Sequence, residues 1–174
     1  MKIKQYIEDK IFITGISGTG KTKIAKYISD NAHPTNPHKY LSLDYDFDYR
    51  YNNESQYVQD YLKNLPKRFV MDGIPYQAQG LSMNFDSFKK YNLEHKIKIL
   101  CLVPTDFNEW KQRILAKQQA IGYASINFFI FYYHILPQLT NLNIDYYDTC
   151  NNKYISIETL YKEITWIAPL SPFI

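Results

Sequence analysis

The chain has 174 residues, which is enough for one domain with a substantial core and too few for two ordinary domains. Its content of 45% hydrophobic and 21% charged residues excludes a disordered segment. A net charge of +3 falls well short of the dense Lys and Arg surface of a dedicated duplex-binding domain. We therefore expect a single domain over residues 1–174 whose substrates are small anionic molecules.

Apolar runs and helical stretches alternate along the chain. The apolar runs predict five strands, at residues 10–14, 40–43, 68–71, 96–103 and 144–147. Helices are predicted at residues 21–29, 55–65, 105–120, 126–136 and 156–167. Gly122 is expected to separate the third helix from the fourth, and Pro137 to end or kink the fourth. The alternation predicts an α/β fold with a mostly parallel sheet of about five strands and helices on both faces.

The cysteines and the hydropathy of the sequence indicate in which cellular compartment the protein is expected. Cys101 and Cys150 lie far apart and without CxxC spacing, so neither a zinc site nor a disulfide framework is indicated. The first ten residues lack the apolar core of a signal peptide, and no run approaches the ~18 apolar residues of a membrane span. We expect reduced thiols, no membrane association and a cytoplasmic protein.

The first predicted strand is followed at once by residues 15–22, Gly-Ile-Ser-Gly-Thr-Gly-Lys-Thr. They match G-x-x-x-x-G-K-[ST], the Walker A motif or P-loop, whose glycines let backbone N–H groups approach phosphate oxygens. Lys21 is expected to reach the β- and γ-phosphates, and Thr22 to coordinate Mg²⁺ at the helix N-terminus. The motif therefore predicts a site for a nucleoside triphosphate and magnesium. The residues expected to hold the nucleotide are Gly15, Ser17, Gly18, Thr19, Gly20, Lys21 and Thr22.

Acidic residues follow the second and third predicted strands. Asp44 and Asp46 are two apart, so on an extended chain their side chains would point to the same side. Asp72 follows the third strand, beside the strand of the P-loop, where a carboxylate associates with Mg²⁺. Phosphoryl transfer needs a group at the acceptor as well as cations around the γ-phosphate. We expect Asp44 or Asp46 to face the acceptor, with a slight preference for Asp44, and Asp72 to lie near the metal and the substrate.

The P-loop, Asp44-Tyr45-Asp46 and Asp72-Gly73-Ile74-Pro75 together make the chain resemble the P-loop kinases of small molecules, a group that includes nucleoside, nucleotide and shikimate kinases. The resemblance implies an ATP- and Mg²⁺-dependent phosphotransferase. It also implies that the carboxylate after the second strand orients or deprotonates the acceptor hydroxyl. Asp-Gly-Ile-Pro is similar to the D-G-F-P of adenylate-type kinases, but those enzymes follow the proline with an arginine for the acceptor phosphate, and Tyr76 follows here.

The same resemblance gives roles to two of the three arginines. Arg113 lies on the helix where small kinases carry lid arginines that close over the transferring phosphate. Arg50 follows the acidic segment and is expected to hold an acceptor anion, whereas Arg68 begins a strand and is expected to be structural. Residues 147–152 follow the fifth strand, where these kinases cradle adenine with backbone atoms.

The leading prediction is a kinase for a small acceptor, most readily a nucleoside or a (deoxy)nucleotide. The alternative is a kinase that acts on nucleic acid, such as a polynucleotide 5′-kinase, since those also place Asp after the second strand with arginine a few residues on. A third reading is an NTPase switch, although the sequence has no N-K-x-D segment and no D-x-x-G at Asp72. The sequence leaves the oligomeric state open.

Overall fold

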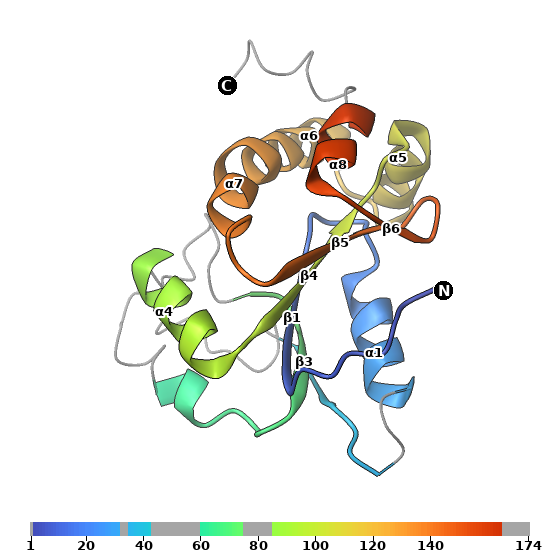
Figure 1. Cartoon of the computed structure of the whole chain (residues 1–174). Helices are drawn as coiled ribbons and strands as arrows, with labels where there is room; N and C mark the ends of the chain where they lie inside the picture. Colours follow the sequence, from blue (N-terminus) through green and yellow to red (C-terminus); the bar gives the residue numbers. More distant parts are fainter. Residues whose placement is uncertain (1, 32–34, 43–59, 75–84, 165–174) are drawn as a thin grey trace.

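The chain folds into an α/β structure built on an open, mostly parallel sheet of six strands (Figure 1). The computed structural model describes residues 2–31, 35–42, 60–74 and 85–164. The strand order is β2-β3-β1-β4-β5-β6, and every neighbouring pair is parallel except β5 and β6. The strands are β1 (Lys10–Thr14), β2 (Lys39–Ser42), β3 (Phe69–Asp72), β4 (Lys98–Val103), β5 (Ile144–Asp148) and β6 (Lys153–Ile155).

Helices cover both faces of this sheet, as the alternating sequence pattern predicts (Figure 1). The described helices are α1 (Lys21–Asn31), α4 (Phe85–His95), α5 (Phe107–Ala116), α6 (Ile121–Ile130), α7 (Leu136–Leu139) and α8 (Ile157–Glu163). A π-helical turn, η2 (Phe131–Ile135), joins α6 to α7. Asp106 caps the N-terminus of α5 by accepting a hydrogen bond from the backbone N–H of Glu109.

Successive side chains of each strand point to opposite faces of the sheet, so the core is divided between the two faces. The face that packs against α1 contains Ile11, Ile13, Ile24, Ala25, Ile28, Val70, Leu100 and Leu102. The alternate strand residues, such as Phe12, Met71 and Cys101, pack against the remaining helices. Among the fully buried side chains on that second face are Trp110, Phe128 and Tyr132. Many of the aromatic rings that are so frequent in this sequence therefore fill the core.

Several element predictions need correction. The sheet has a sixth strand, β6, which the pattern missed because it is only three residues long and pairs antiparallel through a tight turn after β5. Helix α4 was not predicted either. Gly122 lies inside α6 instead of separating two helices. Pro137 lies in the first turn of α7, a position at which proline is tolerated although it lacks a backbone N–H. The structure describes only residues 60–65 of the helix predicted at residues 55–65.

An extended N-terminal segment, residues 2–9, lies against the α1 face and is fastened to β5 by a partly buried ionic network. Lys98 Nζ donates to Asp145 Oδ1 at 3.0 Å, and Lys4 Nζ pairs with Asp145 Oδ2 at 2.8 Å. The Tyr6 hydroxyl lies 3.2 Å from Asp145 Oδ2 and 3.0 Å from the hydroxyl of Tyr154. The side chains of Lys98 and Asp145 are only 8% and 20% exposed, so loss of either partner would leave a charge poorly solvated.

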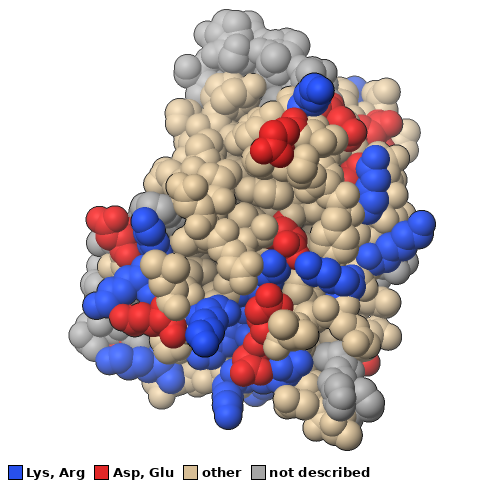
Figure 2. Space-filling view, viewed as in Figure 1, with Lys and Arg blue, Asp and Glu red and all other residues tan. Residues whose placement is uncertain are grey.

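The surface carries charges of both signs. On the face that Figure 2 shows, Lys and Arg side chains are interspersed with Asp and Glu, and the upper left of the described surface is mostly uncharged. None of the helices formed by the described residues is long and apolar enough to cross a bilayer.

We predict that Asp145→Asn lowers the free energy of unfolding by about 2 kcal/mol at pH 7, because Lys98 would keep a hydrogen-bond acceptor but lose its counter-charge. Urea denaturation followed by circular dichroism measures this change. The control is Glu94→Gln, which removes the exposed pair that Glu94 forms with Lys90 and should cost about 0.5 kcal/mol or less. Equal effects of the two substitutions would contradict the structural role of the network.

Ionisation of the Asp145 carboxyl also makes the stability of the fold depend on pH. Burial opposes ionisation of Asp145, but the hydrogen bonds and charges of Lys4 and Lys98 together outweigh it and hold the pKa of the carboxyl below its usual range. A lowered pKa in the folded state gives stability that is present above the pKa of the unfolded chain and is lost as the pH falls through the folded value. The wild type should therefore lose stability at acidic pH more steeply than Asp145→Asn.

Candidate functional site

The loop between β1 and α1, Gly15–Gly20, is the centre of the candidate site, and we call it the glycine-rich loop. It starts from β1, which lies between β3 and β4. Gly15 has φ +142°, and a Cβ atom there would lie 2.6 Å from the backbone oxygen of Leu102 on β4. Because a backbone oxygen cannot move aside as a flexible side chain can, only glycine fits this position.

Side chains hold three carbonyl oxygens of this loop. Lys21 Nζ donates to the oxygens of Gly15 and Ile16 at 3.0 and 3.1 Å, and Thr19 Oγ1 also donates to that of Ile16. Trp110 Nε1 on α5 donates to the Ser17 oxygen at 2.9 Å. Carbonyl oxygens repel anions, so engaging them with donors favours anion binding at the start of α1, where the helix dipole also attracts negative charge.

Thr22 and Asp72 meet beside the loop. The parallel register sets Ile13 of β1 opposite Asp72 at the end of β3, and the Gly73 N–H donates to the Ile13 oxygen at 2.9 Å. Thr22 lies in the first turn of α1, and its hydroxyl donates a short hydrogen bond to Asp72 Oδ2. The sequence predicts these two side chains as magnesium ligands, and the fold brings them into contact.

A cavity of about 940 Å³ opens in front of the glycine-rich loop. Lys21, Thr22 and Asp72 all line it. Their predicted roles toward phosphate and magnesium stay predictions. Further lining residues, to which the sequence motifs give no role, include Lys23 of α1 and residues after β3, on α5 and after α5: Ile74, Trp110, Lys117, Gln119, Ala120, Tyr123, Ala124, Asn127, Ile130, Phe131 and Ile135. Spacings of three and four residues between Tyr123, Asn127 and Ile130 put them on one side of α6, a signal that the sequence did carry.

Arg113 lies apart from this cavity. Its guanidinium donates to the Thr149 hydroxyl and carbonyl, both at 3.2 Å, and forms a close ion pair with Glu109 one turn earlier on α5. Lys117, one turn further along, does line the cavity. A lid role for Arg113 stays a prediction, since the arginine would have to leave Thr149 to reach a phosphate at the loop.

The loop after β5 is held by the buried carboxylate of Asp148. Its oxygens accept hydrogen bonds from Thr105 Oγ1 at 2.8 Å, Asn151 Nδ2 at 2.7 Å and the Cys150 N–H at 2.9 Å. Thr149 is fixed in turn by its own N–H, which donates to the Val103 oxygen. Burial raises the pKa of the Cys150 thiol, which therefore stays neutral at pH 7. This well-ordered backbone loop is the segment for which the sequence predicts contact with a base.

Three predicted site residues, Asp44, Asp46 and Arg50, lie outside the described residues. Their roles stay predictions. Ser42, the last residue of β2, pairs with Asp72 at the end of β3. The described part of β2 therefore ends next to the carboxylate of Asp72.

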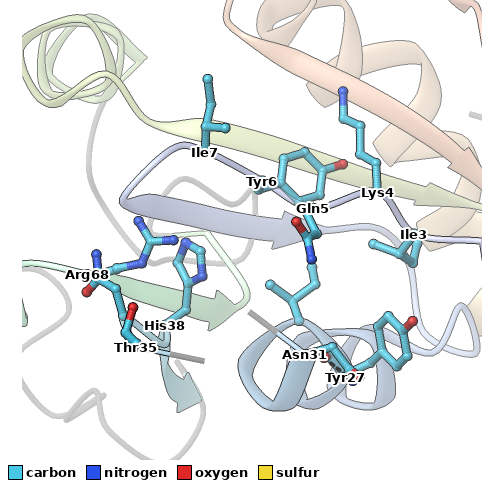
Figure 3. Close-up of a pocket in the computed structure, with 12 residues that line it drawn as sticks. Ile3, Lys4, Gln5, Tyr6, Ile7, Tyr27, Asn31, Thr35, His38 and Arg68 are labelled. Carbon is cyan, nitrogen blue, oxygen red and sulfur yellow. Dashed lines mark hydrogen bonds between the residues drawn. The ribbon is translucent and has the colours of Figure 1, made fainter. Parts of the chain in front are cut away.

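A second cavity, of about 740 Å³, lies at the far end of α1 between this helix and the N-terminal segment (Figure 3). His38 and Arg68 lie side by side on its wall because β2 and β3 are paired. His38 Nε2 contacts the Glu8 oxygen at 2.7 Å, and Arg68 pairs with Asp9 at 2.7 Å. Burial lowers the pKa of His38, so the ring is neutral and donates through Nε2. These contacts tie down the N-terminal segment, which agrees with the structural role expected of Arg68.

Comparison with known proteins gives no relative from which a role could be transferred. No family model matches the chain, and no curated protein matches it at a significant level.

We predict that Gly15→Ala lowers the free energy of unfolding by about 2 kcal/mol or more, because the new Cβ would collide with the Leu102 oxygen at a φ that side chains avoid. The matched control is Gly122→Ala, since a Cβ there meets nothing within 4 Å and alanine favours the α6 helix. Thermal unfolding should show a lower midpoint for Gly15→Ala and an unchanged or higher one for Gly122→Ala. Similar midpoints for both variants would refute the close approach of Gly15 to β4.

Proposed function

We propose that this protein is an ATP- and Mg²⁺-dependent kinase that transfers the γ-phosphoryl group to a hydroxyl of a small acceptor, a nucleoside or a (deoxy)nucleotide. One observation carries the proposal. Lys21 and the Thr22–Asp72 pair converge where the glycine-rich loop meets the cavity of about 940 Å³. A cation, a metal-binding pair and room for an acceptor are the parts that phosphoryl transfer needs.

The glycine-rich loop suits a triphosphate for physical reasons. Its glycines permit a backbone path with positive φ at Gly15, Gly18 and Gly20, which no chain of ordinary residues would adopt. Lys21 rests on the carbonyls of Gly15 and Ile16, so its ammonium group is already at the loop and needs only to exchange acceptors when phosphate oxygens arrive. Such preorganised charge accounts for much of the rate enhancement in enzymes of this kind.

Thr22 and Asp72 fit a magnesium ion. Mg²⁺ in phosphoryl-transfer sites takes only one or two protein oxygens and completes its shell with water and phosphate, and a hydroxyl beside a carboxylate offers such a pair. When bound, the ion would neutralise charge on the β- and γ-phosphate oxygens. The residues of the chain would then position the ligands: Thr22 and Asp72 hold the metal, Lys21 holds the phosphates, and Asp44 or Asp46 is proposed to orient the acceptor hydroxyl.

A small acceptor is favoured over nucleic acid by the distribution of charge. A polynucleotide needs a track of Lys and Arg that follows its phosphates. On the face drawn in Figure 2 the two signs of charge are interspersed, and the net charge of the whole chain is only +3. The nucleic-acid alternative would require phosphoryl transfer that weakens steeply with salt.

We expect Lys21→Ala to lower phosphoryl transfer by roughly 100-fold or more, because it removes one preorganised charge at the transferring group. The fold should persist, since Lys21 is only half-buried and belongs to none of the apolar core clusters. Lys89→Ala, on the exposed side of α4, is the control and should keep full activity. Transfer from labelled ATP measures both, and normal turnover of Lys21→Ala with an intact fold would overturn the proposal.

Asp72→Asn should raise the Mg²⁺ concentration needed for half-maximal activity by roughly tenfold or more, since a neutral amide is a poorer ligand for a hard cation. Thr22→Val should act in the same direction by removing the hydroxyl. Asp86→Asn, an acid in the first turn of α4, is a control away from the cavity. If the magnesium titrations of Asp72→Asn and Asp86→Asn coincide, Asp72 does not serve the metal.

A further inference from the structure

Lys117 is the positive charge that the end of α5 brings to the cavity in front of the glycine-rich loop. It lines this cavity together with Lys21 and Lys23, both of which come from α1. The side chain of Lys117 is exposed. Among the residues that the structure describes, no side chain forms an ion pair or a hydrogen bond with its ammonium group. The cavity therefore receives positive charge from two separate helices.

A reversal of the backbone at the end of α5 holds Lys117 in place. The Gln118 N–H donates to the Leu115 oxygen at 2.9 Å. The Gln119 N–H donates to the Ile114 oxygen at 3.2 Å. These two bonds are those of a Schellman motif, in which the residue after the helix cap takes a left-handed conformation. Gln118 takes it with φ +57°, although it is not a glycine. A strained position of this kind persists only where the surrounding structure fixes it.

Gln119 fastens this turn to the glycine-rich loop. The Ser17 hydroxyl donates to Gln119 Oε1 at 2.8 Å, and the Ser17 carbonyl accepts from Trp110 Nε1 at 2.9 Å. Two residues of an extended chain span at most about 7 Å, so the Cα atom of Lys117 lies within that distance of the Cα atom of Gln119. Lys117 therefore leaves the backbone close to the loop, on the side that α5 covers.

The terminal phosphate of a nucleotide is the group that Lys117 can meet. In a P-loop the backbone N–H groups take the α- and β-phosphates. Given the proposed function, the acceptor occupies the cavity, and the γ-phosphate has to face it for transfer to occur. Lys21 is expected to approach this phosphate from α1. A second ammonium group that lines the same cavity from α5 faces oxygens of the γ-phosphate that Lys21 leaves uncovered.

Arg113 is less suited to this role than Lys117. Its guanidinium forms a close ion pair with Glu109 and donates to both the hydroxyl and the carbonyl of Thr149. All these interactions would have to break before Arg113 could reach a phosphate at the loop, and Arg113 is not among the described residues that line the cavity. Lys117 loses no described side-chain partner when it binds an anion.

We infer that Lys117 is a catalytic residue that binds the γ-phosphate from the side of α5, opposite Lys21. This inference rests on the proposed function and deepens it. In the transfer step an acceptor hydroxyl oxygen bonds to the γ-phosphorus, and the bond from that phosphorus to the β–γ bridging oxygen breaks. The electron pair of the broken bond leaves with ADP, and the hydroxyl proton passes to a carboxylate or to solvent. Negative charge spreads over the γ-phosphate oxygens during this step, and the Lys117 ammonium group neutralises part of it.

The experiment compares two nucleotides that differ in the γ-phosphate. Calorimetric titration of the full chain with Mg²⁺, without acceptor, gives Kd for ADP and for the ATP analogue whose β–γ bridge is an N–H group. Lys117→Ala should weaken binding of the analogue by about tenfold or more and leave Kd for ADP within about twofold, because one charge-assisted contact is lost. Lys117→Arg should restore binding. Lys111→Ala, an exposed lysine of α5 outside the described lining of the cavity, is the control and should change neither constant.

The possible results separate this inference from the proposed function. An unchanged ratio of the two dissociation constants in Lys117→Ala would overturn the inference, and so would loss of that ratio in Arg113→Ala but not in Lys117→Ala. Transfer of labelled phosphate to nucleosides or nucleoside monophosphates with a normal kcat in Lys117→Ala would also overturn it, and would leave a kinase. If the wild type transfers phosphate to no acceptor, the proposed function fails, while the titrations still decide whether Lys117 binds the γ-phosphate.

Two substitutions of Gln118 test whether the turn positions Lys117. Gln118 is not among the described residues that line the cavity, so a change there acts through the backbone. Glycine adopts positive φ readily, whereas a β-branched residue avoids it. Gln118→Val should therefore weaken binding of the analogue by about threefold or more with ADP binding unchanged, and Gln118→Gly should bind both nucleotides as the wild type does. Unfolding curves check that both variants are folded, and equal constants for the two would refute the positioning role of the turn.

Discussion

The parallel pairing of β1 with β3 is the constraint on which the candidate site depends. It sets Asp72 next to the last residues of β1, and the glycine-rich loop then returns the chain so that α1 begins with Lys21 and Thr22. A shift of the register by one residue would turn the Asp72 side chain to the other face of the sheet. The buried alternation of Phe69, Val70 and Met71 between two cores prevents that shift. Core packing, rather than the site itself, therefore fixes the contact between Thr22 and Asp72.

The glycine-rich loop and α5 support one another. The indole of Trp110 donates to the Ser17 oxygen, and a Cβ at Gly18 would lie 2.9 Å from Ile114 Cδ1. Both α5 side chains are completely buried, so α5 cannot move away from the loop without exposing them. The shape of an anion-binding loop is thus set partly by a helix almost a hundred residues later in the chain. A ligand that tightens the loop would tend to fix α5, and with it Lys117 at the end of the cavity.

Local patterns in the sequence predicted the parts of the fold that local chemistry decides. The glycine-rich loop, Thr22 and Asp72 are found where their motifs place them relative to strands, and helices do cover both faces of the sheet. The cavity wall could not be predicted in the same way, because residues far apart in the sequence, such as Ile74 and Asn127, line one cavity only in the folded chain. Strand β6 was not predicted because three residues are too few to show an alternation of apolar and polar side chains. Helix α4 was not predicted because its apolar residues are mixed with polar ones. The position of Arg113 depends on Thr149, a contact between distant segments that no spacing encodes.

The π-helical turn η2 decides which of its side chains line the cavity in front of the glycine-rich loop. In a regular α-helix that continued from α6, the residue on the same side as Asn127 and Phe131 one turn later would be His134. A π-helical turn takes more residues for each turn, so Ile135 lines the cavity instead and His134 is exposed to solvent. A titratable ring is thereby replaced by an aliphatic side chain at the deep end of the cavity. Because Phe131 and Tyr132 of this turn are buried in the core, packing holds the helix in this register. The same packing that stabilises the fold therefore decides that Ile135, and not His134, lines this cavity.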